Sequence, residues 1–286
     1  MALLDSMGQA MVDAGEACMD AGIQVWKSSA EIVLKFCTQD PTSFSGVWGK
    51  ISSVYSIFMG IGATLFTLYF VIGWLRESVD IKSHFSMENI ILLYIRFILT
   101  GWLLLNAMNL IKTVLRLSGL LAAEVGVNIT TNYHTDELFS SLVGDLTGGA
   151  LFGTGLLCLI GGFIGMMVII VSGVTLVLSV LTRFFKVFLC IPFAPMALAS
   201  FAGGHGLSQS GVSWIKTFFA YCLEVVVIAL ALTIASGFFQ NRSNIFSSAD
   251  GWTGTVLGIC NICLPMLTAV SCVKGAEGIL RKTLGL

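Results

Sequence analysis

The chain has 286 residues, of which 56% are apolar and only 11% are charged, and its formal net charge is −1. This composition is typical of a polytopic membrane protein and unlike that of a soluble domain. The near-neutral charge argues against a broad basic surface that grips nucleic acid by its phosphates. We therefore expect an all-α membrane helix bundle with about five transmembrane helices.

Residues 1–45 are expected to form an amphipathic N-terminal helix that ends near Asp40–Pro41. Apolar residues recur every seven positions in a heptad-like stripe made by Leu4, Met11, Cys18 and Val25. Acidic residues fall on another face, which is poorly suited to anionic lipid. The helix is therefore either a protein-contact helix or a solvated surface helix. Its acidic start does not match the basic region of a cleavable signal peptide.

Residues 46–275 form the predicted transmembrane domain. It opens with Ile51–Leu75, a run of 25 residues without a charge that is long enough to span a bilayer. A second span, at about residues 90–111, contains Arg96, which we expect to snorkel to the headgroups in preference to a functional role. Residues 112–147 begin as a helical continuation and then become a polar, acidic loop.

A glycine-rich span follows within residues 146–182, which hold no charge over 37 positions. Five of its glycines fall on a ladder of four-residue steps: Gly149, Gly153, Gly161, Gly165 and Gly173. Small residues on one face let helix backbones approach each other closely. The ladder therefore predicts a helix-packing stripe, directed to another helix of the chain or to a second copy.

Residues 183–211 break the apolar pattern at Pro192 and Pro195, each of which removes a backbone donor and crowds the preceding turn. A helix that reaches this point must kink, stop or turn back. Freed backbone groups at membrane depth need protein or water as partners, so the segment is either an ordinary kinked helix or a packed, pathway-lining one. It is short for a span, so we expect re-entry or a sixth crossing, with Gly203 and Gly204 at its flexible end.

A span at about residues 212–239 contains Glu224 within an apolar run. A carboxylate at that depth is costly, so it marks a functional site, a partner of a buried cation or a structural hydrogen bond. The candidate pathway or buried polar residues are Glu224, Arg96 and Lys186. Pairing of Glu224 with Arg96 or Lys216 stays open.

The last span, at about residues 253–273, precedes a basic tail at residues 276–286, which indicates a cytoplasmic C-terminus. Five spans place the N-terminus outside and six place it inside, and the Lys and Arg balance does not decide between them. We predict no metal or cofactor, because the Cys260–Cys263 pair has no further ligands beside it. The chain has no HExxH or GxSxG motif, so we expect no enzymatic activity.

The order of these features resembles the TrbL family of conjugative type IV secretion systems over about residues 45–275. The likeness rests on Arg183-Phe184-Phe185-Lys186 running into Ile191-Pro192-Phe193-Ala194-Pro195-Met196-Ala197. It implies an inner-membrane channel or scaffold subunit through which relaxase-bound single-stranded DNA passes. It also implies five spans, an external N-terminus, a cytoplasmic C-terminus and association with secretion ATPases and other membrane subunits. The long C-terminal soluble region of larger relatives is absent from this sequence.

On this interpretation the protein is a translocation-channel subunit that works as a homo-oligomer through its glycine-lined helix contacts. The alternative is an ion-coupled secondary transporter of a small solute, with the broken segment as binding site and Glu224 coupling an ion. Such transporters often carry paired broken helices in two repeated halves. One broken segment and no clear repeat make this alternative the weaker one.

Overall fold

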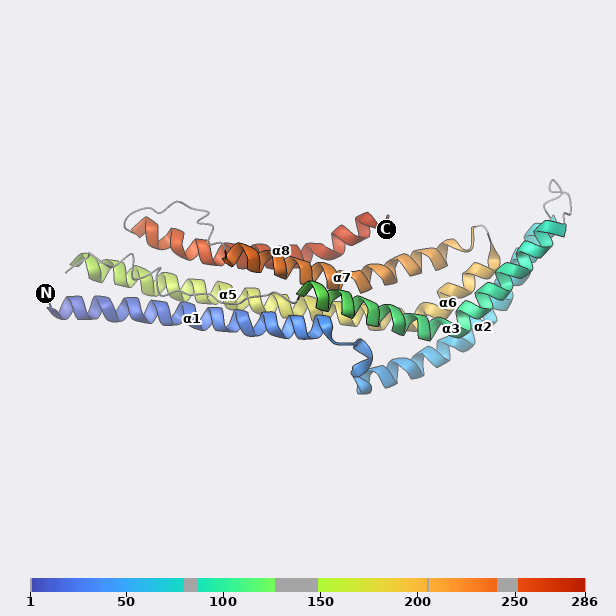
Figure 1. Cartoon of the computed structure of the whole chain (residues 1–286), viewed down its shortest axis with the longest axis horizontal. Coiled ribbons are helices and arrows are strands. Elements are labelled where there is room, and N and C mark those ends of the chain that lie inside the picture. Colours follow the sequence, from blue (N-terminus) through green and yellow to red (C-terminus); the bar gives the residue numbers. More distant parts are fainter. Residues whose placement is uncertain (1, 80–86, 127–148, 205, 241–251, 286) are drawn as a thin grey trace. The chain divides into compact units, whose positions relative to one another are not determined.

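The computed structural model describes residues 2–79, 87–126, 149–204, 206–240 and 252–285. All regular structure in these ranges is helical. The α-helices are α1 (Ala2–Thr38), α2 (Ser45–Val79), α3 (Met87–Gly126), α5 (Gly149–Cys190), α6 (Ala194–Ala199), α7 (Gln209–Gln240) and α8 (Trp252–Thr283) (Figure 1). Five described segments are long and apolar enough to cross a membrane. The predicted all-α, polytopic membrane fold is confirmed.

The chain packs as two compact units, each built from three separate stretches of sequence. Unit 1 comprises Met1–Thr38, Ala122–Val180 and Val226–Ala276, and unit 2 comprises Gln39–Leu121, Leu181–Val225 and Glu277–Leu286. Helices α3, α5, α7 and α8 therefore contribute to both units. This division follows helix packing and differs from the three consecutive ranges suggested by the sequence.

In unit 1, α1 lies along α5 (Figure 1), and the buried positions of both helices alternate by three and four residues. We call this contact the glycine seam. In α1 it consists of Gly8, Val12, Gly15, Met19, Gly22, Trp26, Ser29 and Val33. In α5 it consists of Leu151, Gly155, Cys158, Gly162, Gly165, Ile169 and Leu176. A repeat of seven with small residues on one side is the geometry of a closely packed coiled coil.

The backbones of α1 and α5 meet directly at the seam. A methyl group placed on Gly15 would lie 2.5 Å from the carbonyl oxygen of Cys158, and one on Gly155 would lie 2.6 Å from that of Gly8. The seven-residue period predicted for α1 is present, but the predicted stripe is on the wrong face. Leu4 and Val25 are 42% and 37% exposed. The buried face combines glycines with a second apolar repeat of seven, at Val12, Met19, Trp26 and Val33, so the period alone did not decide which face is buried.

The four-residue glycine ladder is only partly a packing stripe. Gly165 contacts Met19 of α1, Gly173 contacts Ser29, and Gly161 contacts Ile259 of α8. A methyl group built on Gly153 meets no atom of the described residues within 4 Å, so this glycine is not packed against another helix described in this chain, and the surroundings of Gly149 are not described. The physical reason is that each four-residue step goes about 40° beyond a full turn of the α-helix. These rotations add up, so the glycines of a long ladder do not all lie on one face.

Unit 2 contains the α2–α3 pair, which is held together by aromatic rings. The rings of Phe66 and Phe97 stack with centroids 4.6 Å apart, and Phe70 lies 4.4 Å from Phe97. The outer faces of both helices are apolar and open, as at Ile57 and Leu105, which are 66% and 76% exposed. Such faces suit contact with lipid. Helix α3 continues to Gly126, so the first part of the predicted polar loop is helical, while residues 127–148 lie outside the described ranges.

The proline-broken segment continues from α5 through short 3₁₀ turns at Ile191–Phe193 and Ser200–Gly203, on either side of α6. Its backbone stays in the right-handed helical region at Cys190 and Ala194, so the chain does not turn back at the prolines. The whole stretch belongs to one candidate span, Leu151–Gly203. Of the options left open by the sequence, the structure therefore shows an interrupted helix that continues past the prolines, within one of five candidate spans among the described residues.

Packing against α2 explains why the interruption is tolerated. The side chain of Pro195 contacts Gly62, where an added methyl group would lie 2.7 Å from it, and Gly73 faces the carbonyl oxygen of Gly203. The left-handed residues Gly204 (φ 71°) and Gly206 (φ 91°) come just after the segment, where only glycine fits without strain. The chain then enters α7, whose Gly211 N–H donates to the Ser200 hydroxyl oxygen at 2.9 Å.

Candidate functional site

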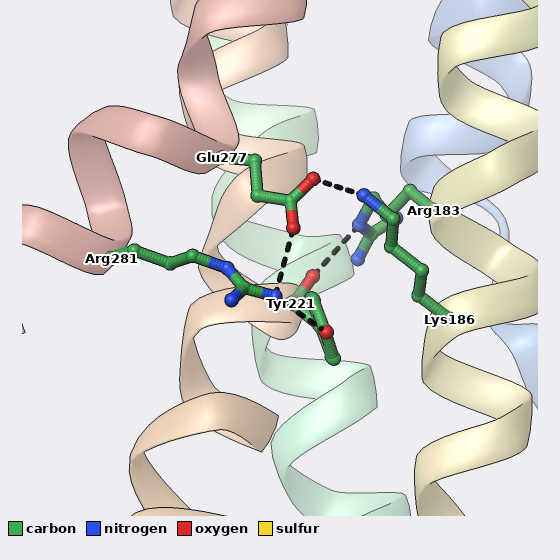
Figure 2. Close-up of polar contacts among 5 residues, drawn as sticks. All are labelled: Arg183, Lys186, Tyr221, Glu277 and Arg281. Atoms are coloured by element: carbon green, nitrogen blue, oxygen red, sulfur yellow. Dashed lines mark hydrogen bonds and ion pairs between the residues drawn. The ribbon is translucent and has the colours of Figure 1, made fainter. Parts of the chain in front are cut away.

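Unit 2 holds a group of charged and polar side chains that project from α5, α7 and α8, each within a candidate membrane span. We call this group the charged cluster, and it consists of Arg183, Lys186, Tyr221, Glu224, Glu277 and Arg281. Figure 2 shows five of these residues converging from three helices. With every group ionised, three cations face two carboxylates. Because charges within apolar helices are costly, such a convergence is by default a functional candidate.

Arg183 is the buried cation of the cluster, with 3% of its surface exposed. Its Nε donates to the Tyr221 carbonyl oxygen at 2.9 Å, and its Nη2 donates to the Cys222 carbonyl oxygen at 3.4 Å. The planar guanidinium can serve two adjacent carbonyls of one helix, which a lysine ammonium cannot do in the same way. These bonds connect the end of α5 to the middle of α7.

Glu277 connects α5 to α8. One of its oxygens pairs with the Lys186 ammonium, and the other accepts from Arg281 Nη2 at 3.0 Å, one helical turn along α8. The side chains of Lys186, Glu277 and Arg281 are 31%, 28% and 44% exposed. This ion-pair group is therefore only half-buried, so its side chains have room to rearrange.

Tyr221 contacts all three cations. Its backbone carbonyl accepts from Arg183, and its hydroxyl oxygen accepts from Arg281 Nη2 at 2.9 Å (Figure 2). Its ring lies 6.0 Å from Lys186 Nζ and 5.8 Å from the Arg281 guanidinium carbon, which is the range of cation–π attraction. Tyr221 therefore holds the partly exposed cations, Lys186 and Arg281, near the buried Arg183.

Glu224 lies one turn along α7 from Tyr221 and is buried, with 6% of its surface exposed. Its Oε2 has no hydrogen-bond partner among the residues that the structure describes. It interacts electrostatically with Arg183 and Lys186 of α5 and with Glu277 and Arg281 of α8. The residue thus belongs to the charged cluster but makes none of the hydrogen bonds that tie its other members together.

Of the three candidate polar residues from the sequence, the structure brings together Glu224 and Lys186. Arg96 lies elsewhere in unit 2, where its guanidinium is 3.0 Å from the position of a methyl group built on Gly204. Arg76 approaches Gly206 in the same way, at 3.3 Å. Arg96 is half-buried at this chain reversal. The sequence could not show that Lys186 lies in the charged cluster and Arg96 lies near Gly204, because the tertiary fold decides which helices are neighbours.

Four members of the cluster were not predicted from the sequence: Arg183, Tyr221, Glu277 and Arg281. Arg183 directly follows the predicted span of residues 146–182, and Glu277 falls in the predicted basic tail. Helices α5 and α8 are much longer than a bilayer requires, and they carry these residues inside the helix. A usable signal was present, since α5, α7 and α8 each carry isolated charges next to long apolar runs.

The chemistry of the cluster is that of charge and protons. Within the described ranges, no group of three or more His, Cys, Asp or Glu side chains could hold a metal ion. Three cations with two carboxylates can attract an anion, and a buried carboxyl group can bind and release a proton.

Comparison of the chain with models of protein families, with curated proteins and with solved structures gave no match.

Proposed function

We propose that this protein is a channel or scaffold subunit of a membrane translocation machine, of the kind that passes relaxase-bound single-stranded DNA across a cell membrane during conjugation. The observation that carries the proposal is the charged cluster, which gathers three cations from two candidate spans around Tyr221 of a third. Cations at membrane depth lower the energy of an anionic chain that passes beside them. Lys186 and Arg281, the partly exposed pair, are the residues that would meet such a cargo.

The charge distribution supports an anionic cargo. The sequence of unit 2 contains eleven Lys and Arg against six Asp and Glu, whereas unit 1 contains four against ten. The net charge of the whole chain is close to zero, but unit 2, which contains the charged cluster, is basic. The resemblance to the TrbL family adds the cargo class, the homo-oligomeric state and the association with secretion ATPases and other membrane subunits, all of which are part of the proposal.

Orientation follows from the same charges. Lys and Arg near the ends of spans favour the cytoplasmic side, so we place the C-terminal end of α8, with Arg281 and Lys282, in the cytoplasm. With five spans, the N-terminal helix α1 is then external. Labelling of single cysteines, introduced near each terminus, with a membrane-impermeant reagent on intact cells tests this arrangement. Labelling of the C-terminal cysteine without permeabilisation contradicts it.

The function is tested by cross-linking DNA to the tagged protein in cells that are transferring a mobile element. We expect the transferred strand to co-purify with the wild-type protein. Lys186→Gln combined with Arg281→Gln should lower its recovery about tenfold, which corresponds to about 1.4 kcal/mol. Lys282→Gln removes a neighbouring exposed charge outside the cluster and is the matched control. Equal recovery from the cluster variant and the control, at equal protein levels, contradicts the proposal.

A second candidate function is ion-coupled transport of a small solute, and Glu224 favours it. A buried carboxyl group without a hydrogen-bond donor can load and release a coupling ion during a transport cycle. Purified protein in liposomes, given a proton or sodium gradient and an internal pH dye, separates the two functions. Gradient-driven solute uptake that Glu224→Gln abolishes supports the transporter, and DNA cross-linking without any such uptake supports the channel subunit.

A further inference from the structure

Glu224 differs from every other ionisable member of the charged cluster in having an unpaired oxygen. Arg183 is engaged by two carbonyls of α7, Lys186 by Glu277, and Arg281 by both Glu277 and the Tyr221 hydroxyl. The Glu224 carboxyl group is 6% exposed, and its Oε2 accepts no hydrogen bond from the described residues. The cations that could neutralise it are therefore nearby but occupied.

A buried carboxylate in this position is much more costly than a neutral carboxylic acid. A buried charge needs a hydrogen-bonded partner, and leaving it without one is strongly unfavourable. A neutral acid gives up only the hydrogen bonds of a polar group, which costs less. The surrounding cations reduce this difference at a distance, but the geometry gives none of them a direct bond to Oε2.

We propose that Glu224 is a proton-binding site, and that it releases its proton when the Lys186 ammonium moves from Glu277 to Glu224. In the arrangement described here Glu224 holds a proton, Lys186 pairs with Glu277, and Arg281 also bonds to Glu277. In the second arrangement Lys186 pairs with the Glu224 carboxylate, Arg281 alone holds Glu277, and the proton has passed to water. The ligand of the site is the proton, whatever cargo the protein carries.

Three features of the cluster make this exchange possible. The charge of Lys186 already acts on Glu224, so the two groups are neighbours in the cluster. Glu277 keeps a partner after Lys186 leaves, because Arg281 bonds to its other oxygen at 3.0 Å. Lys186 and Glu277 are only partly buried, so the ion pair that must open lies at the surface of unit 2. Arg183 stays on the α7 carbonyls and supplies a fixed positive charge in both arrangements.

The exchange links proton release to a change in which helices are joined. In the first arrangement Lys186 joins α5 to α8, and in the second it joins α5 to α7. A proton on Glu224 therefore selects between two sets of interhelical ion pairs. Such a two-state element is what proton-dependent control of a membrane machine requires.

Infrared spectroscopy of the purified full-length protein in lipid tests the proposal directly, because a protonated carboxyl group has its own C=O stretching band. We expect such a band at neutral pH that decreases as the pH rises and is missing from Glu224→Gln. Lys186→Met removes the exchange partner, so the band should persist to a pH higher by about one unit or more. Glu277→Gln frees Lys186 to pair with Glu224, so the band should disappear at a lower pH than in the wild type. Lys282→Gln, the matched control, should leave the pH profile unchanged.

No protonated band at neutral pH in the wild-type protein, or a band that survives Glu224→Gln, overturns the proton site. Equal pH profiles for the wild type, Lys186→Met and Glu277→Gln overturn the exchange. The Gln variant replaces one neutral group by another of the same shape, so failure of Glu224→Gln to fold while Lys186→Met folds also contradicts the proposal. None of these measurements involves DNA, so their outcome is independent of the proposed function.

Discussion

The two units of this protein hold their helices together in different ways. In unit 1 the backbones of α1 and α5 meet at glycines, as where Gly155 faces the carbonyl oxygen of Gly8. In unit 2 the C-terminal parts of α5 and α8 and the middle of α7 are connected by charged side chains around Tyr221. Lipid gives apolar helices little reason to associate, so membrane helices depend on close packing or on hydrogen bonds between polar groups. The glycine seam of unit 1 relies on close packing, and unit 2 adds the charged cluster to a close contact of its own between Gly62 and Pro195.

The glycine seam and the charged cluster differ in how freely their contacts can change. A backbone contact has no side chain that could adopt a second position, so the glycine seam fixes its two helices. The charged cluster consists of long, half-exposed side chains that can exchange partners with little backbone movement. The seam is therefore suited to structural support, and the cluster to the cargo contact and proton binding that we propose. The following four substitutions test this comparison, starting with the one of largest expected effect.

Gly162→Leu should have the largest effect, because any side chain at this position of the seam meets the backbone of Gly15 in α1. Overpacking without room to relax should lower the free energy of unfolding by about 3 kcal/mol or more. Thermal denaturation of a fluorescent fusion, followed by size-exclusion chromatography, measures the loss. Gly153→Leu is the control, since this glycine of the same helix has no neighbour within 4 Å. Equal stability of the two variants would show that the seam does not hold unit 1 together.

Gly62→Val tests how much unit 2 depends on the close contact by which α2 supports the proline-broken segment. The new side chain would meet Pro195, whose Cβ lies 2.7 Å from the position of the added carbon. We expect a loss of about 1–3 kcal/mol in unfolding free energy, measured by the same thermal assay. Gly60→Val, which has open space around it, controls for the lower helix propensity of valine. If both variants melt alike, the segment does not depend on α2.

Arg183→Leu tests the fixed part of the charged cluster. It removes two hydrogen bonds to α7 carbonyls and should lower the free energy of unfolding by about 1–3 kcal/mol. Arg183→Lys keeps the charge but loses the planar fork, so its stability should fall between those of the wild type and the Leu variant. Reversible unfolding in mixed micelles, monitored by helical circular dichroism, gives the three values. A Leu variant as stable as the wild type would mean that this buried cation serves function alone.

Arg281→Gln should have the smallest effect, because the Arg281 side chain is 44% exposed and its ion pair with Glu277 is within one helix. Exposed pairs of this kind contribute about 0.2–1 kcal/mol. The same unfolding assay, at low and high salt, should show a small loss that high salt reduces. Lys282→Gln should show no loss. A loss as large as that of Arg183→Leu would contradict the division of the cluster into a fixed part and a mobile part.

Much of the secondary structure could be predicted from local sequence. Long uncharged runs predicted the spans, and α1 ends at Thr38, close to the expected stop at Asp40–Pro41. Pro192 marks the interruption, since α5 ends at Cys190. These predictions succeed because hydropathy and missing backbone donors act within a few residues. The lengths of α3, α5 and α8 were underestimated, because a helix can continue past the apolar run that identifies it.

The sequence by itself determined that this protein is helical, that it has five segments suited to a membrane and where its longest helix is interrupted. Only the tertiary structure decided which glycines touch, since Gly15 and Gly162 become partners only when α1 lies along α5. It also decided that Arg183, Tyr221, Glu224 and Glu277 form one cluster, although they come from three helices. The physical reason is that helix formation depends on neighbours along the chain, whereas close packing and ion pairing depend on residues that only the fold brings together.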